Sequence, residues 1–478
     1  MIICMEPLLV LSQCSIAEMG TDLPFLIADI DARLTCSVRG YVQRRGRVSR
    51  VYPRVDGDRS YQKILMDKAR ESLLRKKNPL ILSACGSGKG EMAAMIAAAC
   101  HAKSRSVAII TCRRLLVSDL SMRIARYGTP NSIIMAGVAY AGHKTCVVSF
   151  DTATSRGLTL DVDLIIVDEC DLAMSEQRLA FIDRNSHIPR IGMTATAVRG
   201  DGRGLKRLFD EIIEGPSIMD LQQLGFLVPP KVYCAPEVDV SSLDINGEDF
   251  NESQAEKVMN KPGLVGNLVK EYQRLAYGLP AIVHASSVAH SKSIVERFLA
   301  EGIAAAHIDA DSSDAERDAV FARLTLSAKP KTHSILIDVA SNVLRMGFPD
   351  DHREYTLEDQ QKASKSPTSR AMTVVRCPKC WFTYRAGPLK CPECGKASVK
   401  SKKQIQEREA ELVELKRVAA VKRTQTPAQQ ELLRVYQDIA ATAKEKNYKP
   451  GWALVQFKYR TGQFPPKWIR DHEATNER

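Results

Sequence analysis

Ser83-Ala-Cys-Gly-Ser-Gly-Lys-Gly90 lies between an apolar run of strand length, Pro79–Leu82, and a helix-forming run, Glu91–Ala99. A strand, a glycine-rich turn and a helix together form a cradle for phosphate. The glycines let backbone N–H groups approach phosphate oxygens, and the new helix presents its positive end. The residues that would contact a nucleotide are Gly86, Ser87, Gly88, Lys89 and Gly90, with Lys89 reaching the outer phosphates.

The match to the phosphate-loop pattern is incomplete. The pattern has Gly at the first position and Ser or Thr at the last, whereas this chain has Ser83 and Gly90. The hydroxyl that would help to hold Mg²⁺ is therefore missing. Taken alone, the stretch fits a glycine-rich turn that binds nothing equally well, so the other motifs must decide.

Length and composition indicate a multidomain soluble protein. The chain has 478 residues, is 44% hydrophobic and carries a net charge of +12, which favours a polyanionic partner, although a basic enzyme without one is the plain alternative. It has no apolar run of about 18 residues, so we expect no membrane span. The apolar run at Pro7–Leu11 is too short for a secretory signal and no basic residue precedes it.

Strand and helix signals alternate along most of the chain. This alternation predicts parallel sheets covered by helices, and a turn-rich linker around Gly225–Pro230 separates two such sets. In the first set we expect strands at Ser106–Ile110, Cys146–Ser149 and Val162–Val167 and a helix at Arg113–Tyr127; in the second, strands at Ala281–Ala285, Ala304–Ile308 and Ser334–Asp338 and helices at Ser291–Gly302 and Ser313–Leu324.

Two short motifs follow strands of the first set. Asp168-Glu169-Cys-Asp171 stands at the carboxyl end of a strand, where open α/β sheets bind ligands. Asp168 can hold Mg²⁺ there and Glu169 can polarise a water, although a helix N-cap with acidic first-turn residues is the structural alternative. The strand beginning at Arg190 runs into Thr194-Ala195-Thr196, a turn of small residues with two hydroxyls.

Four of the thirteen cysteines form two knuckles. Cys377-x-x-Cys380 and Cys391-x-x-Cys394 have the spacing of a four-thiolate zinc site, and the scatter of the other nine argues against a disulfide framework. A redox pair is the alternative. The aromatic residues between the knuckles, among them Trp381, are able to stack on bases or to pack over the metal site.

Both ends of the chain are basic. Arginines stand at positions 44, 45, 47 and 50. On a helix, Arg47 and Arg50 would share a face that could bind polyphosphate. An isolated basic run is, however, more often a solvated helix face. The segment 396–423 mixes both charges. The tail beyond it alternates aromatic with basic residues, which suits nucleic-acid contact or a small docked helix pair.

Taken together, these motifs resemble a superfamily 2 helicase of the DEAD/DEAH-box, restriction-subunit-like kind. Tyr61-Gln62, the phosphate loop, Asp168–Asp171 and Thr194–Thr196 occur in the family's order. The resemblance covers about residues 1–357, and the tail with its ribbon is similar to that of phage and bacterial members. It implies that Gln62, beside Tyr61, reads adenine, Lys89 holds the β- and γ-phosphates, Asp168 binds Mg²⁺ and Glu169 activates water. Thr194, Ala195 and Thr196 would couple the nucleotide to the nucleic-acid path.

The second domain of that family carries two further motifs, which here stand at the N-terminus. Glu18-Met-Gly20-Thr-Asp22-Leu-Pro24 matches the Gly-x-Asp element, and Gln43-Arg-Arg-Gly-Arg47-Val-Ser-Arg50 matches the arginine helix. We infer a permuted second domain in which residues 1–54 pack beside residues 229–357. The resemblance then makes Gln43, Arg47 and Arg50 catalytic, with the arginines as fingers that stabilise the transferring phosphoryl group, and adds Gly20 and Asp22 to the nucleotide site.

The implied architecture is α/β, with two RecA-like parallel-sheet domains in tandem, a zinc ribbon and a helical tail. The segments are 1–54 (displaced part of domain two), 57–228 (domain one), 229–357 (domain two), 372–398 (ribbon) and 400–478 (basic tail). The implied function is an ATP-dependent DNA helicase or translocase that uses ATP, Mg²⁺ and Zn²⁺, monomeric, cytoplasmic in a bacterial or phage-infected cell, with DNA favoured over RNA and no membrane partner. The alternative is a DNA-binding zinc-ribbon protein that does not hydrolyse ATP. A zinc hydrolase is disfavoured because four thiolates leave no open metal position.

Overall fold

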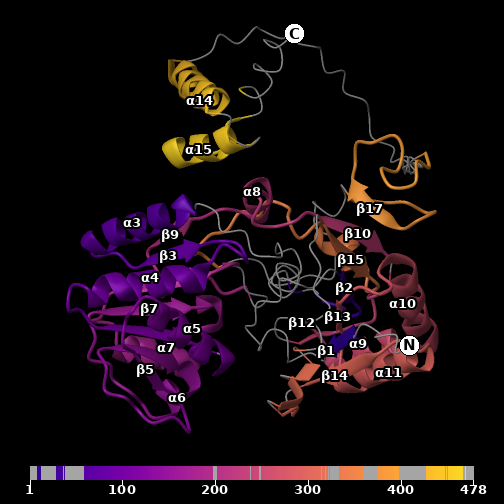
Figure 1. Ribbon diagram of the computed structural model, residues 1–478, viewed down its shortest axis with the longest axis horizontal. Coiled ribbons are helices and arrows are strands. Elements are labelled where there is room, and N and C mark those ends of the chain that lie inside the picture. Colours follow the sequence, from indigo (N-terminus) through magenta and orange to yellow (C-terminus); the bar gives the residue numbers. More distant parts are fainter. Residues whose placement is uncertain are drawn as a thin grey trace, which may run out of the picture. The chain divides into compact units, whose positions relative to one another are not determined.

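The structure is a computed structural model of the whole chain, in which two mixed α/β regions are followed by a separate helical unit (Figure 1). The alternating strand and helix signals are thus confirmed as parallel sheets covered by helices. None of the helices that the structure describes is long and apolar enough to cross a membrane. The structure describes residues 8–11, 28–35, 37, 59–112, 114–197, 202–236, 238–246, 249–309, 311–313, 315–317, 319–320, 322, 333–359, 374–397, 427–446, 448, 451–466 and 469.

The first sheet has seven described strands in the order β5-β6-β4-β7-β8-β3-β9, and all its pairings are parallel. Its central strands are short runs of aliphatic residues buried on both faces, as expected for a parallel sheet. The bounds are β3 (Pro79–Leu82), β4 (Val107–Thr111), β5 (Ser132–Ile134), β6 (Thr145–Ser149), β7 (Leu164–Asp168), β8 (Arg190–Thr194) and β9 (Glu211–Glu214).

Helices cover both faces of this sheet. Phe150, Phe181 and Ile182, from α6 and α7, pack on one face in a core with the strands, while α3, α4 and α5 contact one another and the strands. The bounds are α3 (Ser60–Leu74), α4 (Lys89–His101), α5 (Arg114–Arg126), α6 (Phe150–Ser155), α7 (Glu176–Arg184) and α8 (Ile218–Gln223), with a 3₁₀ turn at Cys170–Leu172.

The second sheet has eight described strands in the order β14-β1-β13-β2-β15-β10-β17-β16. Its parallel part is built from β1 (Leu8–Leu11), β2 (Ala28–Asp31), β10 (Pro230–Cys234), β13 (Ala281–His284), β14 (Ala305–Ile308) and β15 (Ser334–Asp338). The helices of this region are α9 (Glu252–Met259), α10 (Pro262–Leu275), α11 (Val288–Ala300) and α13 (Asn342–Met346), with a small hairpin of β11 (Ile245–Asn246) and β12 (Asp249–Phe250). The helix expected at Ser313–Leu324 lies in large part outside the described residues.

The two N-terminal strands are internal strands of this second sheet. β1 pairs in parallel with β13 and β14, and β2 pairs with β13 and β15; Figure 1 shows these indigo strands among strands from much later in the chain. Ala28 and Ile30 are fully buried in the core that α10 and α11 complete. A segment more than 200 residues away in sequence therefore fills the middle of this sheet.

The cysteine-rich hairpin extends the same sheet. β16 (Val374–Arg376) and β17 (Phe382–Arg385) pair with each other, and β17 continues onto β10 in antiparallel register, with Val232 opposite Thr383 and Tyr233 opposite Phe382. Glu393 accepts hydrogen bonds from Tyr233 Oη at 3.0 Å and from Lys231 Nζ. The ribbon is thus joined to the second sheet through backbone and side chains alike.

The segment that follows the second sheet returns to the first. Tyr355 and Leu357 pack against the core of the first sheet, and Lys206 N donates to Leu357 O at 3.0 Å. Gly204 N donates to the carboxylate of Asp359 at 2.8 Å. Residues 355–359 therefore lie against the first sheet.

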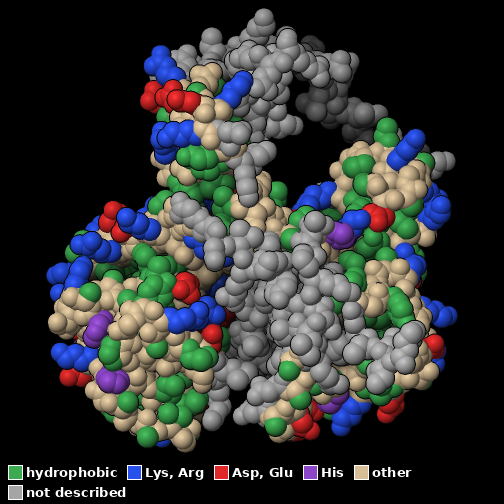
Figure 2. All heavy atoms as spheres, viewed as in Figure 1, with side chains coloured by type: hydrophobic (Ala, Val, Ile, Leu, Met, Phe, Trp, Pro, Cys, Tyr) green, Lys and Arg blue, Asp and Glu red, His purple; other side chains and the backbone are tan. Residues whose placement is uncertain are grey.

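The C-terminal unit is a helix pair of its own, formed by α14 (Pro427–Glu445) and α15 (Trp452–Thr461). Tyr436, Ile439 and Phe457 are buried between the helices together with Ile469, and Tyr448 stacks on Trp452 with ring centroids 4.4 Å apart. Several aromatic residues of the tail thus serve packing within it. On the face drawn in Figure 2, Lys and Arg side chains are spread widely over the described surface, as the net charge of +12 leads one to expect.

Candidate functional site

Three motifs meet at the carboxyl edge of the first sheet. Strands β3, β8 and β7 are neighbours, and their registers place Leu82 beside Thr194 and Asp168 beside Met193. Ser83 N continues the pairing by donating to Thr194 O at 3.0 Å. The phosphate loop, the threonine turn and the acidic pair therefore leave adjacent strands at the same level, which is where sheets of this kind bind ligands.

The loop after β3 has the backbone of a phosphate cradle. Gly86 and Gly88 have φ angles of 90° and 84°, in the left-handed region that favours glycine. A Cβ at Gly88 would come within 2.4 Å of the Gln62 side chain, so close approach also requires glycine there. Lys89 begins α4, and its Nζ donates to Ser83 O at 3.1 Å, which holds the ammonium group over the loop. The hydroxyl of Ser87 is buried and has no hydrogen-bond partner among the described residues.

Tyr61 and Gln62 hold this loop from the first turn of α3. Both are buried, and Tyr61 Oη and Gln62 Nε2 each donate to Ser87 O at 2.8 Å. Burial raises the pKa of Tyr61, so the phenol remains a donor. Because the amide nitrogen of Gln62 is engaged by the loop, its carbonyl oxygen is the group that is left to accept from a base amino group.

Arg59 is a residue of this site that the motifs did not identify. Its Nη1 donates to Gly86 O at 3.0 Å and to Tyr61 Oη at 3.2 Å, and its guanidinium lies 4.4 Å from the ring centroid of Phe226. The sequence shows only that Arg59 stands two residues before Tyr61. A single arginine at such a position does not by itself predict a role in a nucleotide site.

The linker between the two sheets reaches the same loop. Phe226 meets Tyr61 edge-on at 6.2 Å, and the Leu227 side chain lies so near Gly86 that a Cβ there would be 2.9 Å from Leu227 Cδ2. Phe226 and Leu227 are both buried. The linker therefore packs on the phosphate loop before it continues into β10.

Glu169 of the acidic pair has a strained backbone and a side-chain oxygen without a hydrogen-bond partner among the described residues. Asp168 is the last residue of β7 and is buried, while Glu169 has a φ of 47° and a ψ of 49°, which is unfavourable for a non-glycine residue. Such strain costs about 1–3 kcal/mol and is concentrated at functional sites. Glu169 Oε2 is buried without a hydrogen-bond partner in the described part of the chain. Both features suit a carboxylate held ready for a ligand.

The next residues of the motif connect to the threonine turn. Asp171 is fully buried and accepts from Thr194 Oγ1 at 2.9 Å, and Thr196 N donates to the same hydroxyl at 3.2 Å. Ala195 is buried between the threonines. Burial, with the neighbouring acidic residues, raises the pKa of Cys170 well above its ordinary value, so this thiol stays neutral. Asp171 was not among the predicted site residues, although it is the fourth letter of the motif.

Gly90, the departure from the phosphate-loop pattern, has room for a side chain. It lies in the first turn of α4 with an ordinary negative φ, and a Cβ there would be 3.5 Å from Leu120 Cδ2 and 3.7 Å from Arg123 Cδ. These are ordinary van der Waals contacts. Arg123 forms ion pairs with Asp119 at 2.8 Å and with Glu91 at 3.3 Å.

The predicted residues of the N-terminal motifs, Gly20, Asp22, Gln43, Arg47 and Arg50, lie outside the described residues. The described part of that segment ends in a buried polar network. Asn342 Nδ2 donates to Asp31 Oδ2 at 2.6 Å and to Arg33 O at 2.8 Å, and Thr35 N donates to Asn342 Oδ1 at 3.2 Å. These contacts tie the carboxyl end of β2 to α13.

Cys377, Cys380, Cys391 and Cys394 form a compact cluster whose sulfur atoms all lie within 4.8 Å of one another. Cys377 and Cys394 are 3.6 Å apart, and Cys380 and Cys391 are 3.7 Å apart. A tetrahedron with Zn–S bonds of about 2.3 Å has S–S edges of about 3.8 Å, so the arrangement fits zinc. Burial opposes ionisation of Cys377, but the backbone N–H groups of Cys380 and Lys379 lower its pKa to about 6.

Comparison with known proteins gives a family match over the first sheet. Residues 57–199 match the family described as type III restriction enzyme, res subunit. A 51.5 kDa protein of Lactococcus phage (isolate 7-9) is 24% identical over 426 residues, covering 79% of this chain and 92% of that protein. A Saccharomyces cerevisiae protein whose name marks it as a candidate ATP-dependent helicase, IRC3, is 23% identical over 230 residues, covering 41% of this chain and 33% of its own length.

Among solved structures, the UvsW helicase from bacteriophage T4 is 17% identical, with a TM-score of 0.28, covering 37% of this chain and 67% of that one. The match over residues 57–199 spans the phosphate loop, the acidic pair and the threonine turn. In this region the chain is similar to the res subunit of type III restriction enzymes, which confirms the restriction-subunit resemblance that its motifs predicted.

Proposed function

We propose that the chain hydrolyses ATP and uses the energy to move along or unwind nucleic acid, with DNA as its substrate. The observation that carries the proposal is that the loop leading to Lys89 and the Asp168-Glu169 pair follow β3 and β7 at the same edge of one sheet, with β8 between these two strands. The family match to a restriction enzyme subunit and the likeness to a candidate ATP-dependent helicase support it.

Each side chain has a role that its position allows. Lys89 would exchange its contact with Ser83 O for the outer phosphates, and the backbone of Gly86–Gly90 would cradle them. Asp168 would hold Mg²⁺, which neutralises phosphate charge. Glu169, with its unpartnered buried oxygen, would take a proton from the attacking water. The carbonyl oxygen of Gln62 would accept from the amino group of adenine, which a guanine base lacks at that position.

The second sheet would supply the rest of the site through its N-terminal segment. The pairing of β1 and β2 inside that sheet supports the proposal that residues 1–54 are a displaced part of the second domain, alongside residues 229–357. Gln43, Arg47 and Arg50 would then provide charge for the transferring phosphoryl group, and Gly20 and Asp22 would line the nucleotide. The Thr194–Asp171 bond would relay the state of the nucleotide to the nucleic-acid path.

The second candidate is a nucleic-acid-binding protein with a zinc ribbon and no ATP turnover. Gly90 favours it, because the phosphate loop lacks the hydroxyl that would help to hold Mg²⁺. Such a protein would bind DNA with a steep salt dependence and leave ATP intact.

ATP hydrolysis measured with single-stranded, duplex and forked DNA and with RNA separates the two candidates. We expect hydrolysis that DNA stimulates, and its loss in Lys89→Ala and in Glu169→Gln. Lys103→Ala and Glu176→Gln are matched controls, because they make the same changes at exposed positions, one just after α4 and one at the start of α7. Absence of hydrolysis by the wild type with every nucleic acid would refute the motor and leave the binding protein. Loss of activity in the controls as well would show that the assay reports folding only.

A further inference from the structure

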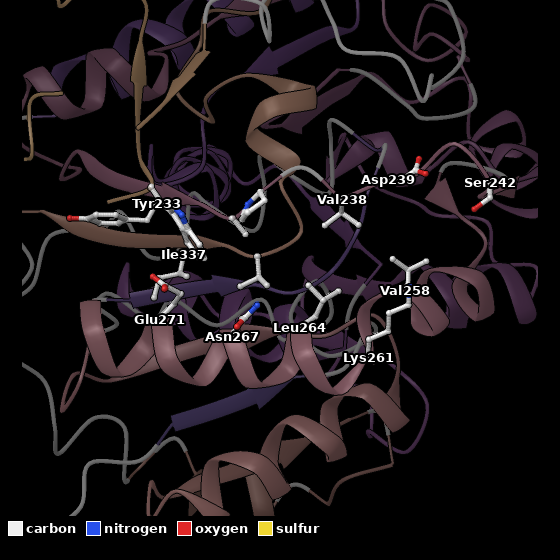
Figure 3. Close-up of a pocket in the computed structure, with 14 residues that line it drawn as sticks. Tyr233, Val238, Asp239, Ser242, Val258, Lys261, Leu264, Asn267, Glu271 and Ile337 are labelled. Atoms are coloured by element: carbon white, nitrogen blue, oxygen red, sulfur yellow. The ribbon is translucent and has the colours of Figure 1, made fainter. Parts of the chain in front are cut away.

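A pocket of about 470 Å³ lies in the second sheet region, between helix α10 and strands β10 and β15, with the ribbon at one wall. Its volume is in the range of small-ligand sites. Figure 3 shows Lys261, Leu264, Asn267 and Glu271 in a row along α10, with Val238 and Asp239 across from them. Trp381 of the ribbon completes the lining. No role in the proposed ATP cycle involves this pocket.

Trp381 occupies a backbone position that favours glycine. It follows the second cysteine of the first knuckle and has a φ of 62°; Gly395 follows the second cysteine of the other knuckle and has a φ of 70°. A bulky residue in the left-handed region is strained, whereas glycine is not. The residue after the second cysteine thus has a left-handed φ in both knuckles, and only the first knuckle has a side chain there. The strain indicates that the indole serves a purpose other than the turn itself.

The indole is also the ribbon aromatic that is not engaged with another ring. Phe382 meets Tyr233 edge-on at 5.5 Å and stacks near Tyr384 at 6.2 Å. Within the part of the chain that the structure describes, Trp381 has no aromatic partner and its indole N–H donates no hydrogen bond. Its side chain is half-buried and lines the pocket. A planar ligand could therefore lie against it.

The polar groups of the pocket suit a nucleotide. Glu271 is paired with Arg274, so its charge is offset, while Lys261 is exposed and makes no ion pair among the described residues. Exposed Asn267 offers an amide that can pair with a base edge. Asp239 lines the pocket as an anion whose pKa is lowered by hydrogen bonds from Ser241, so a phosphate would be directed to the Lys261 side.

We propose that this pocket binds single-stranded nucleic acid, with an unpaired base stacked on Trp381 and the phosphate backbone continuing toward Lys261 at the other end of the pocket. The proposal deepens the proposed function, since it assumes that the chain acts on nucleic acid. An aromatic side chain is a sequence-tolerant platform for bases. The site would hold a strand on the second sheet independently of the nucleotide state of the first.

The test is binding of a fluorescently labelled oligo-dT by the full-length protein without nucleotide, followed by anisotropy. Trp381→Gly should bind about 5- to 150-fold more weakly, the range for loss of one stacked base, while zinc content and thermal midpoint stay equal or rise because the strained φ is relieved. Trp381→Phe should retain most of the affinity. Lys261→Ala should weaken binding and reduce the salt slope by about 0.7, whereas Lys257→Ala, at an exposed lysine outside the pocket, should not.

Unchanged affinity in Trp381→Gly would overturn the proposal and leave the pocket to another partner, such as a peptide. Weaker binding accompanied by zinc loss and a lower thermal midpoint would overturn it too, since Trp381 would then be a packing residue. The outcome is separate from that of the ATPase assay: a wild type that binds oligo-dT through Trp381 but hydrolyses nothing refutes the motor and keeps this site.

Discussion

Gly90→Ser should strengthen Mg²⁺-dependent ATP binding, because it restores the hydroxyl that the phosphate loop lacks. The space exists: a Cβ at position 90 meets its nearest neighbours, Leu120 Cδ2 and Arg123 Cδ, at 3.5 and 3.7 Å. A hydrogen bond or ligand bond to a charged group contributes about 1.5–3 kcal/mol. We therefore expect MgATP to bind roughly 10- to 150-fold more tightly.

Gly90→Ala is the matched control, since it adds the same Cβ without the hydroxyl. Both substitutions remove a glycine from α4 and should stabilise the folded protein by about 0.5–1 kcal/mol. Only the serine variant should gain ATP affinity. The assay is titration with a fluorescent ATP analogue in Mg²⁺ and again in EDTA, where the difference between serine and alanine should vanish.

Equal affinities of the serine and alanine variants in Mg²⁺ would refute the reasoning, because the gain would then come from helix stability. A difference that persists in EDTA would also refute it, because the hydroxyl would then contact phosphate and not the metal. Either result would place the cation on Asp168 and water without help from α4.

Three further predictions concern other parts of the molecule. Arg59→Ala should weaken ATP binding about tenfold, because it releases Gly86 O and the Phe226 ring; equal affinity for the analogue would show that the loop holds itself. Cys394→Ser should lose zinc and lower the thermal midpoint of the second sheet region, since β17 pairs with β10, whereas Cys100→Ser should do neither. Burial lowers the pKa of His290 to about 4. Below about pH 6.5 this histidine is therefore protonated in the unfolded chain but stays neutral in the folded chain. Protonation of the unfolded chain should lower the free energy of unfolding by about 2 kcal/mol between pH 7 and pH 5. In urea unfolding, His290→Asn should show a smaller fall; an identical fall would assign the effect to other groups.

The elements of the first sheet were predictable because each strand is a short apolar run between turn residues. The expected strand at Ser106–Ile110 is β4 at Val107–Thr111, and that at Val162–Val167 is β7 at Leu164–Asp168. Boundaries shifted by one or two residues because strand ends depend on pairing with neighbours. The phosphate loop, the acidic pair and the threonine turn could be placed from the sequence because each stands at the carboxyl end of an apolar strand. Their common edge followed from the parallel topology.

The contacts that hold the site could not be predicted, because they join residues remote in sequence. Nothing near Phe226 indicates that its ring lies under Arg59, and nothing in the knuckles indicates that β17 continues the sheet through Tyr233. Both depend on tertiary packing. The strain at Glu169 and at Trp381 was equally hidden, since a positive φ at a non-glycine residue is imposed by its surroundings.

The second sheet is the part of the molecule whose assembly depends most on distant chain segments. β2 lies between β13 and β15, and the network of Asn342 with Asp31, Arg33 and Thr35 is buried where these strands end. Without β2, the sheet would lose two ladders of hydrogen bonds. The buried Nδ2 group of Asn342 would also lose its acceptors on Asp31 and Arg33, at a cost of about 1–3 kcal/mol. β2, in the N-terminal segment, is therefore a structural part of this sheet, whatever role the segment has in a functional site. Pairing two strands that are close in sequence costs little loop-closure entropy, whereas β2 pairs with strands more than 200 residues away. We therefore expect the second sheet to form after the first during folding.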